Sequence, residues 1–163
     1  MELLVVISII GLLAGLGLPA INGAIKAGKK AEVVAMAESI KTAVNAFYAE
    51  YSTYPANSNG VVFTKTDVNF FGVMCTTTNT NGGNYRGIAF LEVPPKFINA
   101  TNGLVTPQGF LIGKSDNFNI GIDTNGAGVQ TNQVGGKSFT NAASVVVWVS
   151  DPSDKNKPVG TFK

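Results

Sequence analysis

The sequence contains no histidine and a single cysteine, Cys75, among its 163 residues. Without histidine the chain lacks the side chain that most often acts as a general base, and its scattered acids and Arg86 form no recognisable pair with a nucleophile. We therefore expect no enzymatic activity. A lone cysteine excludes a disulfide within the chain, and Cys75 is more typical of a small buried apolar residue than of a reactive one.

Charged residues are also scarce, at 13% of the sequence, and the net charge is only +2. So small an excess of positive charge gives no support for nucleic-acid binding. Apolar residues make up 45% of the chain, which is enough for a core, and the length allows one domain after an anchor.

The longest uncharged stretch lies at the N-terminus, behind a single acid, Glu2. No further charge follows until Lys26, and the run Leu3–Ile25 can cross a hydrocarbon core of about 30 Å at roughly 1.5 Å per helical residue. This pattern indicates a membrane anchor. A cleaved signal peptide would instead carry basic residues in front of its apolar run. A carboxylate in lipid needs a proton or a positive partner, so Glu2 calls for a specific function.

Helix-weakening residues gather in the second half of this run. Pro19 removes an intrahelical donor and strains the preceding turn, and glycines precede it at Gly11, Gly15 and Gly17. We expect the helix to loosen here.

After the run the pattern becomes amphipathic. Apolar residues recur at alternating steps of four and three, which places them on one helical stripe that another element must cover. The helix should end near Tyr54-Pro55, because the residue before proline is pushed out of the helical region. About 54 residues at roughly 1.5 Å each give a helix near 80 Å long. The stripe consists of Val33, Ala37, Ile40, Val44, Phe47 and Tyr51.

The remaining sequence is rich in glycine, asparagine and threonine, a composition typical of turns between short strands. Asn-Gly pairs, which favour tight turns, stand at 59–60, 81–82, 102–103 and 125–126. Runs typical of strands span 61–64, 87–93, 109–113, 117–122 and 144–149.

These patterns predict an α+β fold, in which a long N-terminal α-helix packs against a C-terminal antiparallel β-sheet head. We expect three segments: residues 1–25 as the apolar anchor, 26–54 as the amphipathic continuation of the helix, and 55–163 as the globular head. Trp148 fits the core of the strand at 144–149, and Asn99-Ala-Thr101 matches a glycosylation sequon that a surface turn explains as well.

The N-terminal segment ELLVVISIIGLLAGLGLPAI resembles that of type IV pilins and of the pseudopilins of type II secretion. Glu2 stands at the family's glutamate and Pro19 at its helix-loosening proline. Only Met1 precedes Glu2, whereas processed family members usually carry four residues there, the first of them N-methylated. The resemblance implies that Glu2 meets the terminal amine of an adjacent subunit, here that of Met1, during assembly.

The same resemblance implies a homopolymer whose apolar helices leave the inner membrane and bury one another in a filament at the cell surface. The implied partners are a prepilin peptidase, an inner-membrane platform protein, an assembly ATPase and an outer-membrane secretin. The filament would serve adhesion, motility, DNA uptake or secretion. A periplasmic pseudopilus is the alternative, and a signal-anchored monomeric binding domain is the alternative from another class.

Calcium is a minor expectation, and no other cofactor is predicted. Asp123 and Asn125 resemble the start of an oxygen-ligand loop, although Ala127 stands where a third ligand is expected and turn chemistry alone explains the segment. Asp151 and Asp154 are similar to the late calcium loop of some pseudopilins.

Overall fold

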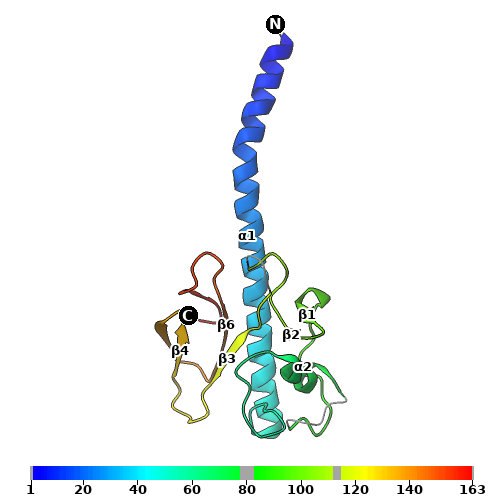
Figure 1. Ribbon diagram of the computed structural model, residues 1–163, viewed down its shortest axis with the longest axis vertical. Helices are drawn as coiled ribbons and strands as arrows, with labels where there is room; N and C mark the ends of the chain where they lie inside the picture. Colours follow the sequence, from blue (N-terminus) through cyan, green and yellow to red (C-terminus); the bar gives the residue numbers. More distant parts are fainter. Residues whose placement is uncertain (1, 78–82, 112–114, 163) are drawn as a thin grey trace. The chain divides into compact units, whose positions relative to one another are not determined.

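The computed structural model describes residues 2–77, 83–111 and 115–162, apart from the side chains of residues 2 and 16–20. The chain divides into two compact units, Met1–Glu32 and Val33–Lys163. A single helix, α1 (Glu2–Tyr51), begins in the first unit and ends in the second (Figure 1). The three-segment division expected from the sequence stays a prediction.

The first unit is the N-terminal part of α1, which is assigned as helix without interruption. The loosening expected there stays a prediction, since the ring of Pro19 and the surroundings of Gly17 lie outside what the structure describes. In the part of the chain that the structure describes, no helix is long and apolar enough to cross a membrane.

The second unit is built around the C-terminal part of α1. Its apolar stripe is covered: Val33, Ala37, Ile40, Val44 and Phe47 are fully buried, and Tyr51 is half-buried. These residues are spaced so that they fall on one face of the helix, which the rest of the unit packs against.

Helix α1 ends at Tyr51, three residues before Tyr54, near which its end was predicted. Ser52 adopts a left-handed φ of 55°, and its N–H donates to the Tyr48 carbonyl at 2.8 Å. This closing turn satisfies one of the last free carbonyls of the helix and redirects the chain before Pro55.

A second helix, α2 (Val68–Cys75), was not expected from the sequence. Asp67 caps its N-terminus by accepting a hydrogen bond from the Phe70 N–H at 2.8 Å. Beyond its C-terminus, the N–H groups of Phe90 and Leu91 both donate to the Met74 carbonyl. The run 87–93, predicted as a strand, therefore terminates a helix instead of joining a sheet.

The four pairs of named strands in the described residues are antiparallel. A three-stranded sheet has the order β3-β6-β7, while β1 pairs with β2 and β4 pairs with β5. A short 3-10 helix, η1 (Pro95–Phe97), precedes β1. The strands are β1 (Ile98–Asn99), β2 (Gly103–Leu104), β3 (Asn119–Ile122), β4 (Gln130–Val134), β5 (Lys137–Asn141), β6 (Val145–Ser150) and β7 (Pro158–Gly160).

The central strand β6 is buried on both of its faces. Successive side chains of a strand point to opposite sides, and Val145, Val147 and Val149 join the main core with the α1 stripe. Val146 and Trp148 join a second cluster with Val134 of the β4–β5 hairpin. In Figure 1, α2 and the β1–β2 pair lie on one side of the C-terminal half of α1, and β3, β4 and β6 lie on the other.

The α+β fold class is therefore confirmed. Of the predicted strands, 117–122 and 144–149 correspond to β3 and β6, whereas 61–64 forms only the bridge between Ala56 and Val62. The run 109–113 extends into residues outside those described. Hairpin β4–β5 was missed, and its turn is Gly135-Gly136, in which both φ angles are positive.

Candidate functional site

The N-terminal part of α1 is a continuous apolar surface. Its nine large aliphatic side chains between Leu3 and Leu13 are each 52–76% exposed, and Ile21 and Ile25 are similarly exposed. The hydroxyl of Ser8 does not interrupt this surface with an unpaired polar group, because it donates to the Leu4 carbonyl at 2.7 Å. A surface of this kind marks a place where another molecule covers the chain.

Four glycines of α1 whose surroundings the structure describes have no steric role within the chain. A Cβ atom added at Gly11, Gly15, Gly23 or Gly28 would meet nothing within 4 Å. Each glycine costs a helix interior about 0.5–1 kcal/mol relative to alanine. Small residues allow a second helix to approach closely. Met1 and the side chain of Glu2 lie outside the described residues, so the predicted assembly contact stays a prediction.

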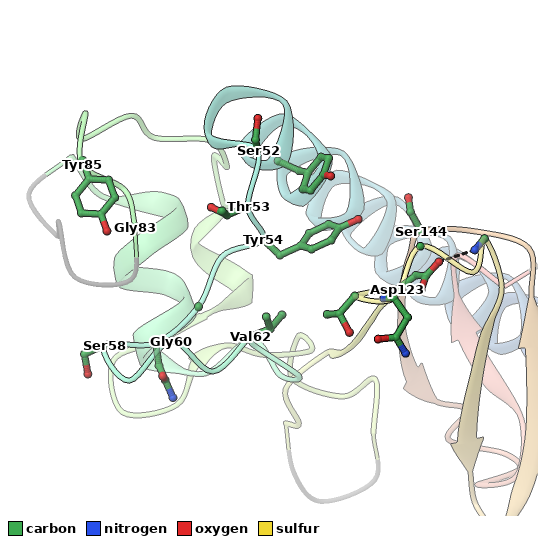
Figure 2. Close-up of a pocket in the computed structure, with 17 residues that line it drawn as sticks. Ser52, Thr53, Tyr54, Ser58, Gly60, Val62, Gly83, Tyr85, Asp123 and Ser144 are labelled. Carbon is green, nitrogen blue, oxygen red and sulfur yellow. Dashed lines mark hydrogen bonds between the residues drawn. The ribbon is translucent and has the colours of Figure 1, made fainter.

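A groove of about 940 Å³ lies in the second unit (Figure 2). One wall is the end of α1 with the turn that follows it, from Tyr48 to Tyr54, and a second is the segment from Ala56 to Val62. The loop after β3, from Asp123 to Gly128, lines the groove together with Ser144 and Tyr85. The groove thus joins segments that are far apart in the sequence.

Three of the four tyrosines, Tyr48, Tyr54 and Tyr85, line this groove, and Tyr51 packs against Tyr85. The rings of Tyr48 and Tyr54 stack with centroids 4.5 Å apart, and those of Tyr51 and Tyr85 meet edge to face at 6.5 Å. Burial, and then the nearby Tyr48 and Asp123, raise the pKa of Tyr54, and a hydrogen bond with the side chain of Ser144 opposes this effect. Figure 2 shows Tyr54 extending towards Ser144 and Asp123.

Sequence analysis did not find this site. The available signal was the presence of three tyrosines, Tyr48, Tyr51 and Tyr54, at intervals of three residues near the end of the predicted helix. Only Tyr51 falls on the apolar stripe of the helix. The periodicity of that stripe does not predict what Tyr48 and Tyr54 contact. The partner segments come from loops whose positions the local sequence does not determine.

Asp123 organises the loop that forms one wall of the groove. Its carboxylate accepts hydrogen bonds from the N–H groups of Gly128 at 2.6 Å and of Asn125 at 3.2 Å. The Gly128 contact, followed by those of Ala127, Asn125 and Gly126, holds the pKa of this carboxyl below its usual value, although partial desolvation opposes the shift. The carboxylate is therefore ionised at neutral pH and engaged by its own backbone.

The residues predicted to bind calcium fall into two separate loops. Asp123 and Asn125 follow β3, while Asp151 and Asp154 follow β6. Because Ile122 pairs with Val145, at the opposite end of β6, the two loops lie at opposite ends of this strand pair. Within the described residues, no three acids, histidines or cysteines are placed to hold one metal ion. Calcium binding stays a prediction.

Asp151 and Asp154 each stabilise a local turn. Asp151 is buried and accepts a hydrogen bond from the Ser153 N–H at 2.8 Å, and Asp154 accepts one from the Asn156 N–H at 3.0 Å. Such bonds are the usual function of aspartate in turns.

Two other residues from the sequence analysis lie away from the groove. Trp148 is buried in the second core cluster, where its ring meets Phe162 edge to face. Cys75 is half-buried at the end of α2, and burial raises the pKa of its thiol to about 12. At neutral pH this thiol is neutral and a poor nucleophile.

The sequence is 32% identical over 94 aligned residues to the type IV major pilin protein PilE1 of Neisseria gonorrhoeae. The match supports the type IV pilin superfamily. It covers 51% of this chain and 52% of the relative, so the chain spans about half the length of the curated relative it matches. No protein-family model and no solved structure matches the chain. The family resemblance identified in the N-terminal segment is thus supported by a curated pilin.

Proposed function

We propose that this chain is a structural subunit that polymerises into a helical filament of the type IV pilus kind. The observation that carries the proposal is the uncovered apolar surface of α1 between Leu3 and Leu13. The similarity to a type IV major pilin supports it.

The free energy of hydrophobic burial favours assembly. Fully burying one large aliphatic side chain stabilises a structure by about 1.5–3 kcal/mol, and this segment offers nine of them. Helices from neighbouring copies can cover one another, with Gly11 and Gly15 allowing close approach. A head-to-tail contact that does not close into a ring produces an open helical polymer.

Before assembly, the uncharged run from Leu3 to Ile25 would reside in the inner membrane, and afterwards it would form the filament core. In this proposal Glu2 pairs with the terminal amine of an adjacent subunit, which neutralises the carboxylate in an apolar environment. A prepilin peptidase, a platform protein, an assembly ATPase and a secretin would process and export the subunit. The subunit itself would have no catalytic step.

Between the members of the superfamily, we favour a surface pilus over a periplasmic pseudopilus. The head contains many amide- and hydroxyl-bearing loops, which suits a solvent-exposed surface. The single cysteine and the two partial calcium loops are the features that suit a pseudopilus. Adhesion, motility, DNA uptake and secretion are all uses that a surface filament would serve.

Electron microscopy of material sheared from cells tests this proposal. Wild-type cells should yield filaments containing the chain, while Glu2→Ala and Glu2→Gln should yield none. Glu92→Ala is the matched control, because it removes an exposed carboxylate from the second unit. We expect it to leave the filaments intact.

Filaments that persist with Glu2→Ala would contradict the assembly function of Glu2. A chain that stays membrane-bound and monomeric in every strain would contradict the polymer and favour an anchored binding domain. Short polymers that remain in the periplasm would favour the pseudopilus.

A further inference from the structure

The groove between Tyr48, Tyr85 and the Asp123 loop has an unusual chemical composition. Asp123 is the one charged residue among the described residues that line it. The other polar lining groups are the hydroxyls of serine, threonine and tyrosine and the amides of Asn57 and Asn125. These groups can both donate and accept hydrogen bonds.

The single charge in the groove disfavours anions. Because backbone N–H groups hold the Asp123 carboxylate in its ionised form, a phosphate, sulfate or carboxylate ligand would meet a negative charge. The same N–H groups are already engaged, so they are not available to bind an anion. The groove therefore suits a ligand that is polar but uncharged.

Aromatic faces supply the apolar part of the site. Tyr48 is 45% exposed although it stacks on Tyr54, and Tyr85 is 78% exposed. In Figure 2, Tyr54 lies beside the Asp123 loop, and Tyr85 lies at the other end of the groove. The faces of aromatic rings carry partial negative charge, which attracts the slightly positive C–H groups of a ligand.

We propose that this groove binds a neutral saccharide. A hexose ring presents C–H groups on one face, which can stack on tyrosine, and hydroxyls around its edge, which can bond to the lining hydroxyls and amides. The volume of about 940 Å³ lies within the range of about 300–1,000 Å³ typical of small-molecule sites, so a short oligosaccharide fits. The site lies wholly within the second unit and does not depend on polymerisation.

Glycan-array binding by the full-length chain tests the proposal. The chain is purified in a zwitterionic detergent without a sugar headgroup. The detergent keeps the chain unassembled, and no detergent sugar competes with the probes for the groove. The probes are neutral oligosaccharides of glucose, galactose, mannose and N-acetylhexosamines, together with sulfated and sialylated forms of the same sugars. We expect neutral probes to bind and their acidic forms to bind more weakly.

Variants locate the binding to the groove. Tyr48→Ala and Tyr85→Ala should each weaken binding about tenfold through loss of ring stacking. Tyr48→Phe and Tyr85→Phe keep the rings and should retain most of the affinity. Ile98→Ala is the matched control, because it removes an exposed apolar side chain of β1 that does not line the groove. Circular dichroism confirms that each variant is folded.

Three results would overturn the proposal. The first is that no neutral probe binds at about 1 mM, and the second is that acidic and neutral forms bind equally well. The third is that Ile98→Ala weakens binding as much as Tyr48→Ala does. A fourth result would assign the groove to another function. If the wild type binds no sugar and Tyr48→Ala abolishes filaments, the groove is a contact between subunits. Because the assay uses the unassembled chain, a failure to bind sugar does not contradict the filament proposal. A failure to form filaments likewise does not contradict sugar binding by the groove.

Discussion

The hydroxyl of Tyr51 donates a 2.8 Å hydrogen bond to the side-chain oxygen of Asn84, which is fully buried. The Asn84 amide nitrogen donates to the carbonyls of Val73 and Ile88, at 2.7 and 2.8 Å, and its oxygen also accepts from the Ile88 N–H at 3.1 Å. One amide thus joins the end of α1 to α2 and to the segment that follows it.

Replacing Asn84 should destabilise the second unit more than replacing Tyr51. Asn84→Leu leaves the buried carbonyl of Val73 and the half-buried carbonyl of Ile88 without these donors, and an unsatisfied buried group costs about 1–3 kcal/mol. We expect a loss of about 3 kcal/mol in the free energy of unfolding. Tyr51→Phe removes a hydroxyl from a half-buried ring and should cost about 1 kcal/mol.

Urea unfolding of the full chain, followed by tryptophan fluorescence, measures both variants. Trp148 is buried in the other core cluster, so it reports cooperative unfolding of the unit instead of a local change near Asn84. Equal losses for the two variants would mean that Asn84 contributes no more than its bond to Tyr51.

Cys75 should be nearly unreactive in the native chain. Burial raises the pKa of its thiol from about 9 to about 12, so the thiolate fraction at pH 8 falls about a thousandfold. Iodoacetamide modification followed by mass spectrometry should be slower by about this factor in native protein than in urea. A native rate within tenfold of the unfolded rate would contradict this effect of burial on the thiol.

The sequence was most informative where structure depends on a local period. The stripe from Val33 to Phe47 is spaced at fours and threes, and the structure buries each of those positions. The run SVVVWV overlaps β6 from Val145 to Val149, and these five buried residues are all apolar, as a strand buried on both faces requires. Both features can be recognised without knowing what packs against them.

Other elements depend on partners that the sequence does not indicate. Strands β4 and β5 are largely polar, and only the Gly135-Gly136 turn signals them. Helix α2 has an apolar sequence with a glycine in it, VNFFGVMC, which has no clear period, and Asp67 was its one available signal. The groove was not predicted because its walls come from loops brought together by the fold.

Asp123 should contribute stability that is lost in acid. Its backbone contacts lower the pKa of the folded carboxyl below the unfolded value of about 3.8. For a lowered pKa, the contribution is present above the unfolded value and disappears as the pH falls through the folded one. Asp123→Asn should therefore be destabilised at pH 7 and should approach the wild type as the pH falls from the unfolded pKa of about 3.8 through the lower pKa of the folded carboxyl.

Urea midpoints measured from pH 7 to pH 2.5 give this comparison. Glu92→Gln, which removes an exposed carboxylate away from the groove, serves as the reference for general charge effects. A constant difference between Asp123→Asn and the wild type across the whole range would mean that the backbone contacts do not depend on the ionised carboxylate.

Two glycines, Gly103 at the start of β2 and Gly136 in the β4–β5 turn, offer a matched test of close packing. Gly103 and Gly136 have similar φ angles of 81° and 88°, so alanine suffers a comparable backbone strain at either position, about 1 kcal/mol. Their surroundings differ. A Cβ atom at Gly136 would meet nothing within 4 Å, whereas one at Gly103 would lie 2.3 Å from the backbone of Asp67.

Gly103→Ala should therefore be far more destabilising than Gly136→Ala. The backbone of Asp67 cannot move freely, because Asp67 caps α2 and its carbonyl accepts the Phe71 N–H at 3.0 Å. We expect a loss of about 1 kcal/mol for Gly136→Ala and about 3 kcal/mol or more for Gly103→Ala, measured by urea unfolding. Similar losses would show that α2 can shift away from β2 at little cost, and that the contact between them does not fix the position of the helix.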